Sequence, residues 1–341
     1  MKTEIVSAQE CAKAISLLRE GEVVALPTET VYGLAADALN PDAVVKVFEA
    51  KQRPHFDPLI VHLPIPEALD EIAIVESKVA HKLMAKFWPG PLTIIFPKRA
   101  IVPEIVTAGL DTVAVRMSAH PIFREVVREL KRPLAAPSAN RFGRISPTTA
   151  QHVFDELSGR IPLIVDGGAT EHGIESTIVR IADDTIEVLR RGPVTDDMLR
   201  EFAEVRTRPS GDIIAPGQLP SHYAPTKPLY LVDDAESFSP APNQRCGLLA
   251  WKASKSGGFP TAVSSGRRSG DRRFLAFAAV RRLSEKQDLR EAAANFFRML
   301  RELDNEDLDL IVVERVPEEG IGAAINDRLR RAATNKPSSR A

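Results

Sequence analysis

The spacing of apolar residues predicts alternating helices and strands over the first two hundred positions. Apolar residues recur every three or four positions over 8–20, which predicts a helix, and the short β-branched run 23–26 predicts a buried strand that ends at Pro27. Asn40 followed by Pro41 predicts the start of a second helix, because Asn caps helix N-termini and Pro fits the first turn. Further predicted strands are 59–63, 92–96, 112–117, 163–166, 176–181 and 186–189, and further predicted helices are 76–87 and 121–130. This alternation is typical of an α/β domain.

Prolines and glycines interrupt this pattern between residues 206 and 228, where we predict a linker. Beyond it, strands are predicted at 230–232, 247–251 and 310–313, a helix at 289–303 and a mobile loop at 254–270. The predicted organisation is an α/β domain over 1–205, the linker over 206–228, a smaller α/β domain over 229–334 and a disordered tail over 335–341.

The bulk composition fits two domains and narrows the class of protein. At 341 residues the chain exceeds the size at which one hydrophobic core usually stops growing. Its 44% hydrophobic and 27% charged residues are ordinary for a soluble globular protein, and a net charge of -1 argues against a surface that is basic throughout. Cys11 and Cys246 are far apart, and no export signal or membrane-length apolar stretch is visible, so we expect a cytoplasmic protein without disulfides.

Two cations lie at the end of the second predicted helix, in the segment Lys51-Gln52-Arg53-Pro54. Lysine supplies a compact charge and arginine a planar fork, and together they suit a polyphosphate. A helix C-terminus explains the same residues, because cations there complement the helix dipole. His62, on the next predicted strand, is either a buried structural histidine or a neutral ligand for a polar substrate. These residues alone leave both interpretations open.

Hydroxyl and amide side chains follow two predicted turns further along the chain. Ser138 and Asn140 lie in a Pro-Ser-Ala-Asn segment after an apolar run, and Ser146 precedes Pro147. Small hydroxyls and backbone N–H groups in such places contact anions. Ser146 is also predicted to cap a helix that begins at Pro147, and both roles can hold at once.

Other motifs carry weaker signals. No Walker phosphate loop, Ser-His-Asp relay, HExxH motif or carboxylate cluster is visible, so no metal site in the protein itself is predicted. Residues 320–325 follow a strand and begin a helix, but Ile325 replaces the small third residue of the dinucleotide fingerprint, so close packing explains these glycines better. Several arginines could touch RNA, although a solvated loop is favoured because no aromatic residues are interleaved. They are Arg267, Arg268, Arg272, Arg273, Arg281 and Arg282.

Taken together, a set of motifs resembles the YrdC-like family. The segments are 27–34 (PTETVYGL), 51–54 (KQRP), 58–62 (PLIVH), 88–93 (WPGPLT) and 137–140 (PSAN). Downstream, 221–225 (SHYAP), 291–295 (EAAAN) and 324–328 (AINDR) resemble the linker and second domain of the long, two-domain threonylcarbamoyl-AMP synthases. The resemblance covers nearly the whole chain. It implies a YrdC-like twisted mixed sheet with helices, plus a smaller Rossmann-like α/β C-terminal domain.

This resemblance also implies roles for individual residues. L-threonine would be bound by Thr30, His62, Arg116 and Ser176, with Arg116 as the fork for its carboxylate. ATP would be bound by Arg53, Thr112, Ser138, Asn140, Ser146, Arg190 and Tyr223, with Lys51 and Arg53 as the catalytic cations. Three residues depart from the family pattern: Asp57 replaces a basic or amide residue, Ala136 replaces a hydroxyl residue, and Gln218 replaces methionine.

The implied activity condenses L-threonine, bicarbonate and ATP to threonylcarbamoyl-AMP and pyrophosphate, for threonylcarbamoyladenosine modification of tRNA. Magnesium would arrive on the ATP phosphates, and the linker with Tyr223 would cover the site. A tRNA threonylcarbamoyl transferase complex is the expected downstream partner, and direct tRNA binding is left open. Two alternatives are an RNA-binding module without catalysis and a carbamoyl-transfer maturation protein. The latter normally carries cysteine-rich zinc modules, which two isolated cysteines cannot form.

Overall fold

The computed structural model describes residues 1–207, 223–252 and 277–333, which belong to two compact units, Met1–Leu219 and Pro220–Ala341. Each unit has its own sheet and hydrophobic core, as expected for two α/β domains. Most of the predicted linker, including Gln218, lies outside the described residues. So do the predicted loop 254–270, the arginines at 267, 268, 272 and 273, and the predicted tail.

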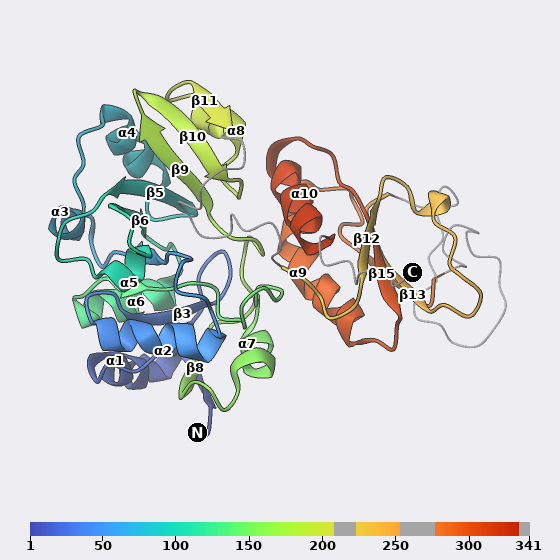
Figure 1. The fold of residues 1–341 in the computed structure, drawn as a ribbon, viewed down its shortest axis with the longest axis horizontal. Helices are drawn as coiled ribbons and strands as arrows, with labels where there is room; N and C mark the ends of the chain where they lie inside the picture. The colour runs from blue at the N-terminus through green and yellow to red at the C-terminus, as the bar shows by residue number, and fades with distance from the viewer. Residues whose placement is uncertain (208–222, 253–276, 334–341) are drawn as a thin grey trace. The chain divides into compact units, whose positions relative to one another are not determined.

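The first unit is built on an 11-stranded mixed sheet. Its strands are β1 (Glu4–Ser7), β2 (Val24–Leu26), β3 (Gly33–Asp37), β4 (Ile60–His62), β5 (Leu92–Pro97), β6 (Thr112–Arg116), β7 (Leu134–Ala135), β8 (Leu163–Asp166), β9 (Thr177–Ala182), β10 (Thr185–Arg190) and β11 (Val205–Thr207). Their order is β1-β8-β2-β3-β7-β4-β6-β5-β9-β10-β11. In Figure 1, β9 to β11 lie at the top of this unit and β8 near the bottom.

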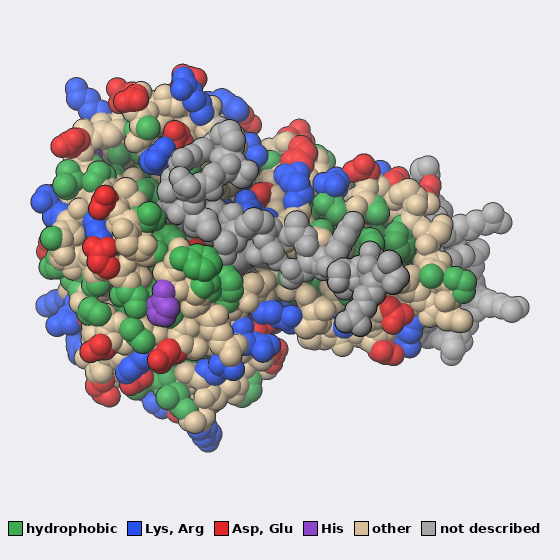
Figure 2. All heavy atoms as spheres, in the orientation of Figure 1, with side chains coloured by type: hydrophobic (Ala, Val, Ile, Leu, Met, Phe, Trp, Pro, Cys, Tyr) green, Lys and Arg blue, Asp and Glu red, His purple; other side chains and the backbone are tan. Residues whose placement is uncertain are grey.

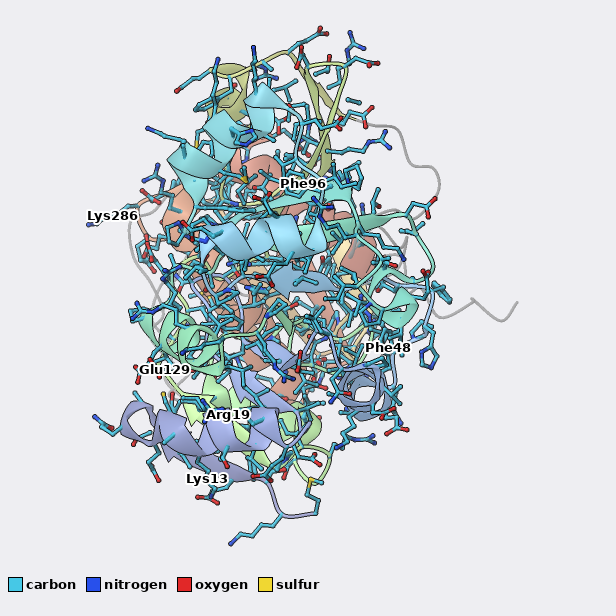
Figure 3. The ribbon with its side chains drawn as sticks, turned by 90° about the vertical axis from the view of Figure 1, so that its left-hand side faces the viewer. Lys13, Arg19, Phe48, Phe96, Glu129 and Lys286 are labelled. Atoms are coloured by element: carbon cyan, nitrogen blue, oxygen red, sulfur yellow. The ribbon has the colours of Figure 1, made fainter. Side chains whose placement is uncertain are left out.

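Helices cover this sheet with their apolar stripes. They are α1 (Cys11–Arg19), α2 (Pro41–Lys51), α3 (Leu69–Ile72), α4 (Lys78–Phe87), α5 (Glu104–Thr107), α6 (Pro121–Leu130), α7 (Ala150–Leu157) and α8 (Asp196–Arg200). Helices α1 and α6 share one core cluster, and at its edge Arg19 Nη2 donates to the Glu129 backbone oxygen at 3.0 Å (Figure 3). Phe48 of α2 and Phe96 of β5, also labelled there, belong to a larger cluster.

Most of the predicted helices and strands are confirmed. Strand β3, which is not predicted, lacks the residue pattern by which a strand is recognised in sequence. Helix α6 and strand β8 have the predicted bounds, and Asn40 caps α2 as expected, with its Oδ1 accepting from the N–H groups of Asp42 and Ala43. Strand β3 is not predicted because Gly-Leu-Ala-Ala-Asp has neither β-branched residues nor alternation. It is nevertheless buried along its whole length between β2 and β7. Its small side chains therefore suit the middle of the sheet.

The second unit has a four-stranded sheet of parallel strands, which agrees with the expected Rossmann-like domain. Its strands are β12 (Leu229–Val232), β13 (Cys246–Ala250), β14 (Ala279–Arg282) and β15 (Leu310–Glu314), and its helices are α9 (Leu289–Asn305) and α10 (Gly320–Ala333). Their order is β12-β15-β13-β14. The prediction that Arg281 and Arg282 lie in a solvated loop is wrong, because both belong to β14. Arg281 forms ion pairs with Glu302 and Glu306, so the basic side chain is used within this unit.

The glycines at the start of α10 are packing residues, as the sequence indicates. A Cβ atom on Gly322 would lie 2.1 Å from the Pro317 backbone oxygen and 3.1 Å from Leu289 Cδ2. Such contacts leave no room for a side chain. This segment therefore brings α10 close to the start of α9.

Replacing Gly322 by alanine is expected to lower the free energy of unfolding by about 2 kcal/mol, because the backbone must shift to admit the methyl group. Chemical denaturation of the full chain measures this change. Exposed Glu319, replaced by alanine, provides the control and should change it by less than about 0.5 kcal/mol. A Gly322→Ala midpoint equal to that of the wild type would contradict the packing interpretation.

Two exclusions drawn from composition can be compared with the structure. Among the described residues, no helix combines the length and the apolar character needed to span a bilayer. Cys11 and Cys246 are buried free thiols in different units, and burial raises the pKa of each. Neither thiol is therefore set up as a reactive nucleophile.

Candidate active site

One face of the first sheet carries polar groups at both ends of the parallel pair β4 and β6. The register pairs His62 with Arg116, so these residues lie side by side where both strands end. The other end lies at Pro58, just before β4, and at Thr112, the first residue of β6. An extended chain of four residues separates Pro58 from His62 by roughly 13 Å. A cluster of apolar side chains lies along the same strands: Ile60, Ile95, Ala114, Ile178 and Leu189.

At the Pro58 end, the turn after α2 holds the guanidinium of Arg53. Its Nε donates to the Asp57 backbone oxygen at 3.2 Å, and its Nη2 donates to the Pro58 backbone oxygen at 2.9 Å. The same Nη2 lies 2.8 Å from Asp57 Oδ2, and both side chains are buried. Burial raises the pKa of Asp57, while the nearby cations Arg53, Lys51 and Arg190 oppose the rise. Asp57 is thus a counter-ion inside a cationic cluster.

Lys51 supports the turn that contains Ser138 and Asn140. Its Nζ donates to the backbone oxygens of both residues at 2.5 Å, and its own backbone oxygen accepts from the Phe142 N–H at 2.8 Å. Burial, together with the charge of Arg53, holds the pKa of Lys51 well below its usual value. The two hydrogen bonds show that the Lys51 amino group holds the Ser138–Asn140 turn in place. The catalytic role of Lys51 stays a prediction.

Backbone hydrogen bonds join three segments that are far apart in sequence into one wall. The Leu34 N–H donates to Pro137 O, and the Ala139 N–H donates to Tyr32 O, each at 2.8 Å. The Tyr32 N–H in turn donates to Pro147 O at 2.9 Å. The loop after β2, the turn after β7 and the segment around Ser146 are thus fixed side by side.

Ser146 does not cap a helix, so that prediction is wrong. Its hydroxyl donates to Glu175 Oε1, and α7 begins only at Ala150, where Thr149 caps it by accepting from the His152 N–H. The physical reason lies in the wall described above: the carbonyl of Pro147 is used by the loop after β2 and cannot start a helical turn.

Asn140 has a mainly structural set of contacts. Its Nδ2 donates to the backbone oxygens of Arg141 and Arg144 at 2.7 and 3.0 Å, which closes the loop between them. Its Oδ1 is buried and has no hydrogen-bond partner among the described residues. A substrate donor is the natural complement of such an atom, so the predicted nucleotide contact remains open.

Ser176 connects the two ends of the site. Its Oγ lies 2.8 Å from Thr93 Oγ1, and the register of β5 with β6 places Thr93 opposite Arg116. On its other side, Arg190 donates from Nη2 to Ser176 Oγ and from Nε to Ser176 O, each at 3.0 Å. Since Arg190 is within electrostatic range of Asp57, Ser176 stands between the Arg116 and Arg53 ends.

Arg116 is held by three acceptors from different parts of the chain. Its Nη2 donates to Glu29 Oε1 at 2.6 Å, its Nη1 to Thr30 Oγ1 at 3.1 Å and its Nε to Gly90 O at 3.3 Å. The other Glu29 oxygen accepts from Ser118 Oγ at 2.5 Å. These three contacts use three of the five N–H groups of the guanidinium and leave one on each terminal nitrogen.

Glu29 is ionised at every physiological pH. Burial alone raises its pKa, but Arg116 and the Ser118 hydroxyl outweigh burial and bring the pKa down to about 2 from the usual 4.5. Because the folded-state pKa is the lower one, the pair stabilises the fold above pH 4.5, and this stabilisation is lost as the pH falls towards 2.

His62 is neutral and almost completely buried beside Arg116. Burial, and then the charge of Arg116, lower the pKa of His62 to about 3. Its ring packs on Phe123 with the centroids 4.6 Å apart, and its Nδ1 has no hydrogen-bond partner among the described residues. The structure is therefore compatible with both interpretations of this histidine. Its ring is buried and packed as in a structural residue, and its Nδ1 is available as a neutral partner for a polar substrate.

Three other residues named from sequence lie as follows. Thr112 is half-buried at the start of β6, at the Arg53 end. Ala136 is buried and donates its N–H to Ile60 O at 2.9 Å. Tyr223 belongs to the second unit and is buried there. Its ring centroid lies 5.7 Å from that of Phe297, and the Arg328 guanidinium carbon lies over the Tyr223 ring, 5.6 Å from its centroid. Its predicted nucleotide contact stays a prediction.

Four residues of the site are not singled out from sequence: Glu29, Thr93, Ser118 and Glu175. Glu29 lies in the Thr-Glu-Thr segment after β2, and a charged residue between hydroxyls after a buried strand is a signal in itself. Its partner Arg116 is 87 positions away, and only the folded sheet brings the two together.

The site is rich in cations and hydroxyls. In the described part of the chain, no group of three or more His, Cys, Asp or Glu side chains is arranged to hold a metal ion. Among its acids, Asp57 is paired with Arg53, Glu29 is paired with Arg116, and Glu175 accepts from the Ser146 hydroxyl. This arrangement suits anionic substrates that bring phosphate or carboxylate groups.

The fold and the site define a two-domain α/β protein whose larger sheet carries buried arginines and hydroxyls on one face. A family model described as "Telomere recombination" (Sua5_yciO_yrdC) matches residues 16–192, and one described as "Threonylcarbamoyl-AMP synthase, C-terminal domain" matches residues 194–334. The chain belongs to this Sua5/YrdC family, in its two-domain form.

Similar proteins cover the chain almost end to end. Threonylcarbamoyl-AMP synthases from Pyrococcus abyssi and Bacillus subtilis are 38% and 40% identical over 94% and 95% of this chain, and over 93% of their own lengths. The crystal structure of P. abyssi Sua5 complexed with L-threonine matches with a TM-score of 0.82 at 34% identity, and covers 98% of both chains. The similarity therefore includes both domains.

Proposed function

We propose that this protein makes threonylcarbamoyl-AMP from L-threonine and ATP. The observation that carries the proposal is the division of one sheet face into two polar ends, with Arg116 at one and Arg53 at the other. One end suits an amino acid carboxylate and the other suits phosphates. The names of the two-domain relatives refer to a product that joins these two kinds of group.

In this proposal threonine binds at the Arg116 end. The two remaining terminal N–H groups of Arg116 receive the threonine carboxylate as a fork, and Thr30, which already accepts from Arg116, lies beside it. His62 contributes its spare Nδ1 as a neutral partner, and Ser176 contributes its hydroxyl. The complex of P. abyssi Sua5 with L-threonine supports an amino acid substrate for this family.

The nucleotide binds at the Arg53 end in the same proposal. Arg53 faces the phosphates, and Ser138, Asn140, Ser146, Thr112 and Arg190 complete the contacts. Lys51 acts by holding the Ser138–Asn140 turn in place. Asp57 tempers this field and keeps Arg53 oriented.

The reaction follows from these positions. The threonine ammonium group first loses a proton to solvent, and the neutral amine adds to carbon dioxide derived from bicarbonate and releases a second proton as the carbamate forms. A carbamate oxygen then bonds to the α-phosphorus of ATP while the bond to pyrophosphate breaks. No covalent intermediate with the protein is required, which agrees with a site whose groups position and stabilise charge. Arg53 and Arg190 stabilise the negative charge on the phosphoryl oxygens.

Magnesium, in this proposal, reaches the site with ATP. Two buried acids at the nucleotide end are already engaged, Asp57 with Arg53 and Glu175 with Ser146, and the described residues offer no carboxylate cage for the ion there. Mg²⁺ commonly keeps several waters and is held through substrate phosphates, so this donor set fits a metal bound to ATP. There it would neutralise phosphate charge.

The product would be passed on to a tRNA threonylcarbamoyl transferase complex in the cytoplasm. It would serve there in the threonylcarbamoyladenosine modification of tRNA.

The rival function is an RNA-binding module. On the face drawn in Figure 2, basic and acidic side chains are interspersed over the first unit, which favours small substrates over a nucleic acid backbone. Salt titration separates the two, because RNA affinity falls steeply with salt and needs no ATP.

Pyrophosphate release by the full-length chain tests the proposal. Release from ATP is expected only when both threonine and bicarbonate are present, because the carbamate is the attacking group. Omission of each component in turn provides the controls. Release that continues at the same rate without threonine, or without bicarbonate, would contradict the proposed reaction.

A further inference from the structure

The buried carboxylate of Glu29 has no part in the proposed reaction, yet it makes the shortest of the three side-chain contacts of Arg116 described above. The Arg116 and Glu29 side chains are each only 4% exposed. Removing two charges from water is costly, and a buried pair of this kind adds little net stability compared with apolar residues of similar size. Fold stability alone is therefore a weak explanation for this pair.

The geometry fixes the carboxylate as well as the guanidinium. Ser118 Oγ donates to Glu29 Oε2, which prevents the carboxylate from turning, and Glu29 Oε1 then receives Arg116 Nη2. The backbone oxygen of Glu29 also accepts from the His172 N–H at 2.9 Å, which anchors the loop. Thr30 and Gly90 hold two further N–H groups of Arg116. A planar fork held in this way presents its remaining terminal N–H groups in one direction.

We propose that Glu29 is a positioning residue for the substrate amino acid, holding the Arg116 fork towards the threonine carboxylate and matching the charge of the site to a zwitterion. This inference rests on the proposed function, because it takes Arg116 as the carboxylate ligand. Glu29 itself acts through Arg116 and is not a catalytic residue.

The charges around Glu29 support the second part of this inference. Arg116 is positive, Glu29 is negative, and burial lowers the pKa of both His62 and His120, so these histidines stay neutral. The Arg116–Glu29 pair therefore adds no net charge where threonine is proposed to bind. A threonine zwitterion, also neutral overall, enters without leaving a buried net charge, whereas the same acid without its amino group would leave one negative charge.

Replacing Glu29 by glutamine tests this directly, since the side chain keeps its size and loses its charge. Threonine binding by the full-length protein, measured by calorimetric titration without ATP, is expected to weaken at least tenfold. The KM for ATP in pyrophosphate release should change less than twofold. The preference for threonine over 2,3-dihydroxybutanoate, which lacks the amino group, should fall, because the Glu29→Gln pocket carries an uncompensated positive charge.

Two further variants keep the test decisive. Ser118→Ala removes the hydroxyl that fixes Glu29 and also accepts from the His120 N–H at 3.2 Å, and it should weaken threonine binding in the same direction by a smaller factor, even if Glu29→Gln folds poorly. Asp37→Asn is the matched control: Asp37 is a buried carboxylate on β3 paired with Arg132 at 2.7 Å, and it lies three strands away from Arg116 in the sheet order β3-β7-β4-β6. It should leave both threonine and ATP parameters within twofold.

The inference would be overturned if Glu29→Gln bound threonine as tightly as the wild type, or if the folded variant showed an equal rise in the KM for threonine and the KM for ATP. Threonine-dependent pyrophosphate release by the wild-type protein would still support the proposed function in that case. Absence of threonine-dependent release in the wild type would instead overturn the proposed function and, with it, this inference. The two failures are therefore distinguishable.

Discussion

Replacing Arg116 by alanine is expected to lower kcat/KM for threonine by at least roughly a hundredfold, which corresponds to about 3 kcal/mol. The variant loses the fork for the substrate carboxylate and leaves Glu29 as a buried charge without its cation. The free energy of unfolding should also fall, by about 3 kcal/mol or more. Steady-state pyrophosphate release and chemical denaturation measure the two effects separately.

Arg132→Ala provides a control for the stability part of this result. It removes the cation from Asp37, another buried carboxylate of the same unit, but Arg132 itself is exposed, and its partner Asp37 lies three strands away from Arg116 in the sheet. Its threonine parameters should stay at the wild-type level. If Arg116→Ala and Arg132→Ala lowered activity to the same extent, loss of fold rather than loss of a ligand would explain both.

Replacing Arg53 by alanine is expected to have the second largest effect: a fall in turnover of roughly a hundredfold or more, with the KM for ATP raised, because a cation that stabilises phosphoryl charge is removed. The change also leaves Asp57 buried without its closest cation. Stability and catalysis therefore need to be separated. Pyrophosphate release at saturating threonine measures turnover.

The double variant Arg53→Ala/Asp57→Asn makes that separation. It removes the uncompensated carboxylate, so it should regain most of the stability lost in Arg53→Ala, while turnover stays low. Full turnover in Arg53→Ala would contradict the role given to Arg53. Recovery of turnover in the double variant would show that Arg53 serves only to balance Asp57.

Much of the framework is predictable because local chemistry decides it. Asn40 caps α2 because Asn accepts from the free N–H groups at a helix start, a preference that is visible in sequence. The apolar run of β8 is typical of a strand that is paired on both sides and buried. Strand β3 escapes prediction because its small residues carry no periodic signal. Its place is decided by β2 and β7, which are themselves far apart in sequence.

The site is less predictable than the fold because its contacts are long-range. The sequence indicates Lys51 and Arg53 as a pair acting together on phosphate, but the structure gives them different surroundings: Lys51 faces backbone carbonyls, and Arg53 faces Asp57. Ser146 follows the helix-cap rule in sequence, yet its neighbour Pro147 is bonded to the loop after β2. Local preference yields to tertiary contacts in both places.

Asp57 illustrates how the structure changes the interpretation of a single residue. In sequence it is an acid at a position where the resemblance to the family leads one to expect a basic or amide residue. In the structure its carboxylate lies 2.8 Å from Arg53 Nη2 and within range of Lys51 and Arg190, so it moderates three cations. Burial raises the pKa of Asp57, and the three cations oppose this rise. An isosteric Asp57→Asn change therefore alters charge more than shape.

A crystal structure of the full-length protein with L-threonine and a non-hydrolysable ATP analogue tests the divided site most directly. The account predicts the threonine carboxylate within hydrogen-bond distance of the Arg116 terminal nitrogens and the nucleotide phosphates near Arg53, with Ser176 between the two ligands. Threonine bound away from Arg116, or both ligands at the same end of β4 and β6, would contradict it.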